Sequence, residues 1–208
     1  DNTAVTGYDV YSGTTLLGST TSTTYSVTGL TASTAYTFSV KAKDAAGNTS
    51  ASSNIVNVTT LAVATVTYCT SQGNSVADEK IGKVVFATIN NTSTGGTGYT
   101  NFTNLSTNVA RGSSNTITIT PSWTSTKYSE GYAVFIDYNQ DGDFADSGET
   151  VFTKAASTAT TATGTITIPA TATLGATRMR VSMKYNAIPT SCEAFSYGQV
   201  EDYTVNIT

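Results

Sequence analysis

The stretch AYTFSVKAKD, residues 35–44, has the alternation of a half-buried β-strand. Tyr36, Phe38 and Val40 are large and apolar, and polar side chains separate them. Successive side chains of a strand point to opposite faces, so this pattern buries one face and leaves the other in water. Outward from it, the chain is rich in Thr, Ser, Val and Tyr, and we find no convincing run at helical spacing. The sequence therefore predicts an all-β protein.

Two segments differ in the length of these patterns. In residues 1–60 we expect short strands within TGYDVYSG (6–13), TLLGSTT (15–21), TTYSVTGL (23–30), STAYTFSVKAKD (33–44) and SNIVNVTT (53–60). A short linker, residues 61–67, is predicted to precede a second domain at 68–208, a two-sheet antiparallel β-sandwich. Its strands are predicted near 81–90, 114–120, 131–137, 149–154, 163–168, 176–185 and 199–207.

Composition excludes several classes of function. The 208 residues include no His, which removes Ser-His-Asp catalysis and His-ligated zinc. Only carboxylate pairs remain for acid/base chemistry and none is convincing, so we do not expect an enzyme. The formal net charge of −4 and ten scattered Lys and Arg argue against nucleic-acid binding. No apolar run is long enough to span a bilayer, so no membrane insertion is expected.

The two cysteines, Cys69 and Cys192, indicate the compartment. A single disulfide between them is predicted, in a protein that is secreted or on the cell surface, with two free thiols as the alternative. Closing a loop of this length would stabilise the fold by roughly 4–5 kcal/mol in the chain-entropy model.

An acidic stretch, DYNQDGDF at 137–144, predicts a structural Ca²⁺ site. Oxygen-bearing residues at alternate positions of a tight loop can surround a hard cation, which takes six to eight oxygens. The candidate ligands are Asp137, Asn139, Asp141, Asp143 and Glu149, with Asp146 as an alternative to Glu149. The competing interpretation is a solvated hairpin, because Asp, Asn and Gly favour turns on their own.

Aromatic residues in polar segments are the candidates for ligand binding. Tyr and Trp rings stack on the apolar faces of sugar rings while polar neighbours bond the hydroxyls. The candidates are Trp123, Tyr128, Tyr185, Tyr197 and the basic Arg178. A lone Trp in a loop is more often a lid on the core than a platform for a ligand.

Residues 1–60 resemble the C-terminal part of a bacterial fibronectin type III domain. The resemblance rests on GYDVY (7–11), YSVTGLTASTAYTFSVKAKDAAGNTS (25–50) and VNVTT (56–60). It implies a partial sandwich whose first strands are missing, and a tyrosine corner at Tyr36.

Residues 68–208 resemble a GEVED-type domain of secreted multidomain proteins, many from Bacteroidetes. The resemblance rests on YCTSQGN (68–74), INNTS (89–93), GYTNFTNLST (98–107), FIDYNQDGDFADSGETVF (135–152), RMRVSMKY (178–185) and CEAFSYGQVEDYTVNI (192–207). Gln199 stands where the family's signature has its first Glu.

Together the two resemblances imply a non-catalytic carbohydrate-binding module pair, tethered to other domains of a secreted polysaccharide-degrading enzyme. Polysaccharide is then the expected partner. Two alternatives remain open: a structural or adhesive module of a cell-surface or filament-forming protein, and a protein-binding accessory domain of a secreted protease. Fold alone does not choose among them.

Overall fold

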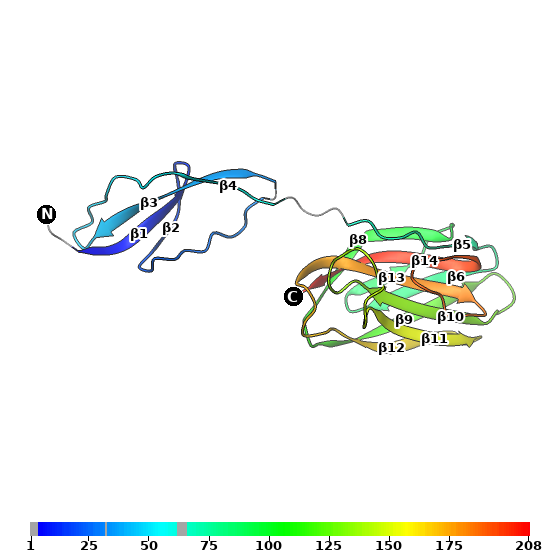
Figure 1. Cartoon of the computed structure of the whole chain (residues 1–208). Coiled ribbons are helices and arrows are strands. Elements are labelled where there is room, and N and C mark those ends of the chain that lie inside the picture. Colours follow the sequence, from blue (N-terminus) through cyan, green and yellow to red (C-terminus); the bar gives the residue numbers. More distant parts are fainter. Residues whose placement is uncertain (1–3, 32, 62–65) are drawn as a thin grey trace. The chain divides into compact units, whose positions relative to one another are not determined.

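The computed structural model describes residues 4–31, 33–61 and 66–208. The chain divides into a first unit, Asp1–Thr65, and a second unit, Val66–Thr208. All regular secondary structure in the described residues is β-strand (Figure 1), which confirms the all-β prediction. Residues 62–65 of the predicted linker lie outside the described residues. Within the described part of the chain, no helix is long and apolar enough to cross a membrane.

The first unit is one antiparallel sheet with the strand order β2-β1-β3-β4. Its strands are β1 (Val5–Ser12), β2 (Thr15–Thr20), β3 (Ala35–Asp44) and β4 (Val56–Thr59). The Tyr36 hydroxyl accepts a hydrogen bond from the Thr31 backbone N–H at 2.9 Å, the bond of a tyrosine corner. The strand predicted at 23–30 is wrong: no described strand pairs with this segment, so its backbone does not enter a sheet.

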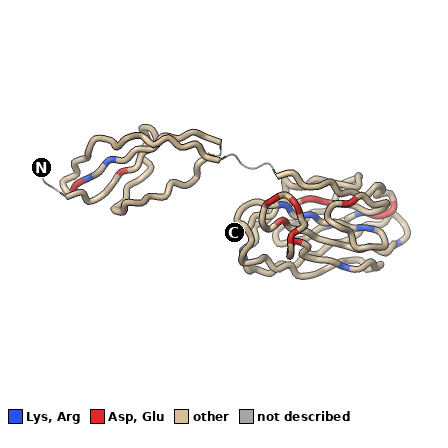
Figure 2. The backbone as a smooth tube through the Cα atoms, in the orientation of Figure 1, with Lys and Arg blue, Asp and Glu red and all other residues tan. Residues whose placement is uncertain are grey.

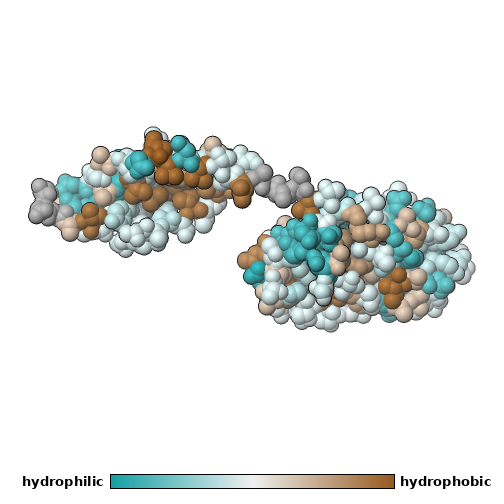
Figure 3. Space-filling model, in the orientation of Figure 1, coloured by the Kyte–Doolittle hydropathy of each residue, from teal (hydrophilic) through white to brown (hydrophobic). Residues whose placement is uncertain are grey.

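One sheet cannot enclose a core, and the burial of the first unit reflects this. Val10 is the one large hydrophobic residue among the described residues of this unit that is buried. Apolar residues are visible as a brown patch on its surface in Figure 3. A hollow of about 520 Å³ lies over the sheet, and its apolar and aromatic lining comprises Tyr8, Val10, Tyr25, Val27, Phe38, Val40 and Val56.

The second unit is a sandwich of two sheets. The six-stranded sheet runs β11 (Thr150–Ser157), β10 (Glu130–Ile136), β13 (Gly175–Tyr185), β14 (Ala194–Ile207), β5 (Gln72–Ser75), with β8 (Tyr99–Val109) also paired to β14. The four-stranded sheet runs β12 (Ala162–Thr167), β9 (Ser114–Trp123), β6 (Glu79–Phe86), β7 (Ile89–Thr92). The inward side chains of both sheets form one buried core that includes Ile81, Ile117, Val134 and Val181.

Two features of this sandwich were not predicted. The strand β14 pairs in parallel with β5 and then with β8, so the larger sheet is mixed. The strands β5, β7 and β8 were missed because their Asn, Gly and Thr residues also favour turns. Pairing with a distant strand decides their conformation; for example, Phe102 on β8 stacks on Tyr203 of β14 at 5.6 Å between centroids.

Charged residues are sparse along the backbone (Figure 2), and one group of them is buried inside the second unit. Asp202 accepts hydrogen bonds from Arg180 at 2.8 and 2.9 Å and from Arg178 at 3.0 Å. Arg180 also donates to the backbone carbonyls of Cys69 and Ser191. A buried ion pair whose remaining donors bind carbonyls is strongly destabilised when one partner is removed, so this group ties the start of the unit to its core.

Candidate functional site

Three of the tyrosines predicted from the sequence line one pocket at an end of the sandwich. The rings of Tyr128 and Tyr185 meet edge to face with centroids 5.8 Å apart, and Tyr185 meets Tyr197 in the same way at 6.2 Å. Asp78 and Glu79 complete the lining of a pocket of about 210 Å³. We call these five residues the tyrosine pocket. The Tyr185 and Tyr197 side chains are 43% and 45% exposed, which leaves them accessible to a ligand.

The strand registers explain why these residues meet. Glu130, the first residue of β10, lies opposite Tyr185, the last residue of β13. Gly198 on β14 lies opposite Lys184, which places Tyr197 beside the same end of β13. Gly198 has a φ of 119° and a Cβ there would collide with the carbonyl oxygen of Met183, so only glycine permits this approach.

Two buried carboxylates adjoin the pocket, and sequence reasoning missed both. Glu79 is 3% exposed and Glu130 is fully buried. One Glu130 oxygen accepts a long hydrogen bond of 3.5 Å from the Trp123 indole, and the other has no partner among the described residues. Burial, and then the charge of Glu79, raises the pKa of Glu130 to about 7. Burial, and then the charge of Asp78, raises the pKa of Glu79.

A sequence signal for these carboxylates existed. Glu130 has the same parity as Tyr132, Val134 and Ile136, which all face the core. Glu79 likewise has the parity of Ile81 on β6. Because side chains of one parity share a face of the sheet, alternation alone places both glutamates on the inner faces of their sheets.

The other two binding candidates lie outside the pocket lining. Trp123, at the end of β9, is opposite Glu79 and partly buried, with the Lys127 ammonium 5.8 Å from its ring centroid. Arg178 lies seven residues from Tyr185 on β13, roughly 23 Å at ~3.3 Å per residue. Its guanidinium bonds Asp202 and covers the Tyr68 ring at 4.4 Å. Trp123 therefore contacts the carboxylates beside the pocket without lining it, and Arg178 has a separate structural role.

The acidic loop, residues 137–149, connects β10 to β11 at the other end of β10. Asp137 is fully buried and accepts hydrogen bonds from the backbone N–H groups of Gln140 at 2.6 Å and Gly142 at 3.1 Å. The Tyr68 hydroxyl donates to the same carboxylate at 2.7 Å. Asp137 therefore organises the turn from within.

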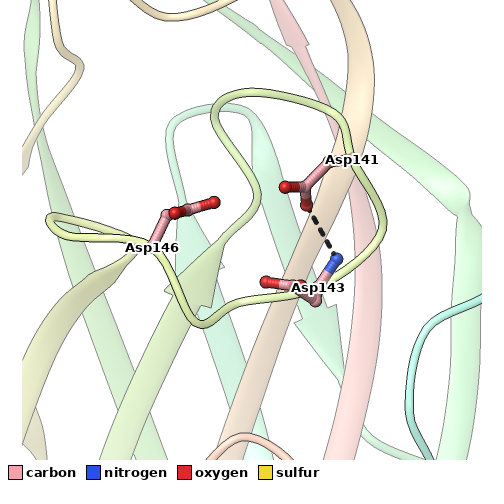
Figure 4. A group of neighbouring side chains, drawn as sticks. All are labelled: Asp141, Asp143 and Asp146. Atoms are coloured by element: carbon pink, nitrogen blue, oxygen red, sulfur yellow. Dashed lines mark hydrogen bonds between the residues drawn. The ribbon is translucent and has the colours of Figure 1, made fainter.

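The metal candidates of the acidic loop separate into an inner and an outer group. Glu149 is buried and accepts a bond from the backbone N–H of Tyr138 at 2.8 Å. On the exposed side, carboxylate oxygens of Asp141, Asp143 and Asp146 lie within 4.8 Å of one another, and these side chains point toward the same space (Figure 4). The Asn139 side-chain amide joins this outer group by donating to Asp141 at 2.8 Å and to Asp146 at 2.7 Å.

The outer group has the chemistry that Ca²⁺ prefers. The three carboxylates supply oxygen ligands only, and the loop is exposed enough for water to complete a shell. The Asn139 oxygen accepts a hydrogen bond from the Asp141 backbone N–H at 3.1 Å, so the NH2 group of this amide faces the carboxylates. The hydrogen bond from Asn139, followed by the one from the Asp143 backbone, lowers the pKa of Asp141. The inner residues Asp137 and Glu149 already accept hydrogen bonds from the backbone. Asp146, the predicted alternative to Glu149, is the residue that lies in the outer group.

The predicted disulfide between Cys69 and Cys192 is present, with the Cα atoms 5.6 Å apart. Cys69 follows Tyr68, which bonds Asp137 in the acidic loop. Cys192 lies in the connection between β13 and β14, the segment that joins Tyr185 to Tyr197. The bond therefore connects the supports of both candidate sites.

Comparison with known families finds one match within each structural unit. The fibronectin type III domain model matches residues 1–59, and the GEVED domain model matches residues 131–206. The chain therefore contains a segment that matches the fibronectin type III model, followed by a segment that matches the GEVED model. In this GEVED segment, Gln199 uses both ends of its amide: it accepts from Ile81 N–H at 3.0 Å and donates to Thr97 O at 3.0 Å. An ionised glutamate at this position could not make the second bond.

The relatives of this chain match it through fibronectin type III domains. Chitinase A1 of Niallia circulans is 62% identical over 65 residues, which are 31% of this chain and 9% of the relative. Exoglucanase B of Cellulomonas fimi is 51% identical over 85 residues, 36% of this chain and 8% of the relative. The chain thus spans under a tenth of the length of these two relatives. Their organisms do not support the expected source in Bacteroidetes.

A solved structure of fibronectin(III)-like modules from Clostridium thermocellum aligns over 100% of this chain and 80% of its own chain. Its sequence identity is 16% and its TM-score is 0.27, so it carries no argument about this fold.

Proposed function

We propose that this chain is a non-catalytic carbohydrate-binding module pair of a secreted polysaccharide-degrading enzyme. The observation that carries the proposal is the tyrosine pocket, where three aromatic rings converge on an open space beside carboxylate acceptors. Aromatic faces pack against sugar rings, and carboxylates accept hydrogen bonds from sugar hydroxyls. Chitinase and exoglucanase relatives support a polysaccharide context and a chain tethered to further domains in an extracellular setting.

The size of the tyrosine pocket indicates how much of a sugar it would hold. Its volume of about 210 Å³ is below the ~300–1,000 Å³ of sites for drug-sized ligands. A single sugar ring or a chain end is the scale of ligand that fits it. The module would then anchor its enzyme to substrate at a point.

In the same proposal, Ca²⁺ orders the acidic loop and does no chemistry. Asp141, Asp143 and Asp146 would hold it, and bound Ca²⁺ would offset the mutual repulsion of the three carboxylates. Because the acidic loop and the tyrosine pocket are at opposite ends of β10, the ion would act on stability and have little direct effect on sugar affinity.

The test is affinity electrophoresis of the chain on a panel of neutral, uronic and sulfated polysaccharides. We expect retardation by at least one of them, and its loss in Tyr185→Ala. Tyr25→Ala is the matched control, because Tyr25 is a 38% exposed tyrosine that lines the hollow of the first unit. Binding that survives Tyr185→Ala but fails in Tyr25→Ala would move the site to that hollow. No retardation by any polysaccharide, with a folded protein, would favour the structural, adhesive or protein-binding alternatives.

A further inference from the structure

The polar groups of the tyrosine pocket are acidic and lack cationic partners. Asp78 and Glu79 line it, and no ion pair among the described residues involves either of them or Glu130. Two lysines of this unit have other contacts: Lys184 bonds Glu193 at 2.7 Å, and Lys127 lies over the Trp123 ring. The pocket therefore holds negative charge that its own side chains do not neutralise.

Glu79 gives this charge a specific position. Glu79 is only 3% exposed, and it lines the pocket. No hydrogen bond to its side chain occurs in the described part of the chain. A buried carboxylate normally has a hydrogen-bond or ionic partner, because desolvation of an unpaired charge is costly. Its lack of a partner indicates that the partner is a ligand in the pocket.

The tyrosine rings of the pocket also favour a cationic ligand. The face of a tyrosine ring carries negative electrostatic potential and attracts a cation within ~6 Å of its centroid. The Tyr185 ring is nearly perpendicular to the rings of Tyr128 and Tyr197, so both faces and edges border the pocket. An ammonium group there would contact ring faces and the Glu79 carboxylate together, whereas a sulfate or uronate would be repelled by the carboxylates.

We propose that the tyrosine pocket recognises the free ammonium group of an amino sugar, so that its ligand is a glycan containing unacetylated glucosamine-type residues. This inference rests on the proposed carbohydrate-binding function and names the substrate class for that site. Asp78 and Glu79 would bind the ammonium group, and Tyr128, Tyr185 and Tyr197 would enclose the ring that carries it. An N-acetylated ring lacks the charge and would bind more weakly.

The experiment is calorimetric titration of the full chain with glucosamine oligomers and with N-acetylglucosamine oligomers of equal length, in low salt. We expect the amino form to bind about tenfold more tightly, the scale of one cation–π contact together with one ion pair. Glu79→Gln should bring the two affinities to within about twofold of each other. Asp146→Asn, an equal change of charge in the acidic loop, should leave the preference intact.

The outcomes separate the two proposals. Equal affinity for the two oligomers in the unsubstituted chain would overturn the amino-sugar inference and leave carbohydrate binding standing. Binding of neither oligomer, nor of any polysaccharide in the panel, would overturn both. Tighter binding of a lysine-containing peptide than of glucosamine oligomers would overturn the amino-sugar inference in favour of a protein partner.

Discussion

Several carboxylates lie at each end of β10, and the two groups differ in their hydrogen bonding. In the acidic loop, Asp137 and Glu149 are buried but accept bonds from backbone N–H groups. Beside the tyrosine pocket, Glu79 and Glu130 are equally buried but receive almost none. Buried carboxylates therefore organise a turn at one end of β10 and carry unneutralised charge at the other. Only the second arrangement leaves buried carboxylates without a backbone hydrogen-bond donor among the described residues.

The largest change would come from removing the disulfide that supports both ends. The double variant Cys69→Ser, Cys192→Ser should lose about 4–5 kcal/mol of unfolding free energy in the second unit, because the bond closes a loop across a sequence separation of 123. Urea denaturation followed by Trp123 fluorescence measures this. A midpoint that does not move would show that the buried Arg180–Asp202 group alone holds the start of the unit.

The next largest effect should come from removing Asp137, the buried carboxylate that accepts backbone hydrogen bonds. Asp137→Ala should destabilise the second unit by about 3 kcal/mol, because it leaves the N–H groups of Gln140 and Gly142 without their acceptor. Asp143→Ala is the matched control in chelator, since Asp143 is exposed, and it should change stability little. Equal losses in the two variants would contradict the division into inner and outer residues.

Calcium should stabilise the second unit through the acidic loop alone. At one hundred times its Kd, Ca²⁺ should raise the unfolding free energy by about 2.7 kcal/mol. Asp143→Ala should reduce this gain, whereas Ser147→Ala, a nearby exposed position outside the carboxylate group, should keep it. Identical thermal unfolding of the unsubstituted chain in calcium and in chelator would refute the metal site.

The last effect concerns Glu130, at the end of β10 beside the tyrosine pocket, and it has the opposite sign. The pKa of Glu130 rises from 4.5 to about 7 on folding, so the folded state holds a proton that the unfolded state releases between these values. Stability contributed by Glu130 is therefore complete below pH 4.5, falls as pH rises to 7 and is constant above. Glu130→Gln should stabilise the chain by about 3 kcal/mol above this range and have no effect below it.

Thermal unfolding of Glu130→Gln and the parent across pH 4–8 checks this sign, with Asp78→Asn as an exposed control. A variant that is less stable than its parent above pH 7 would show that the carboxylate of Glu130 has a partner that stabilises its charge.

How much the sequence predicted depended on whether the signal was local. Period-two alternation located β3, and the strands predicted in the second domain correspond to β6 and to β9 through β14. The polar surroundings of Tyr128, Tyr185 and Tyr197 marked them as accessible. Strand β8 was missed because its conformation depends on pairing with β14 about one hundred residues later. The ligand set of the acidic loop was predicted by counting positions, which cannot show that Asp137 faces backbone donors. Glu79 and Glu130 come together only through the registers of two sheets.

The most direct test of the central claim is an NMR titration of tyrosine-labelled protein with the oligosaccharide that binds best. The account predicts that ring resonances of Tyr128, Tyr185 and Tyr197 shift together, while those of the buried Tyr138 and Tyr203 remain in place. Shifts confined to Tyr8 and Tyr25 of the first unit, or no tyrosine shift at saturation, would contradict it.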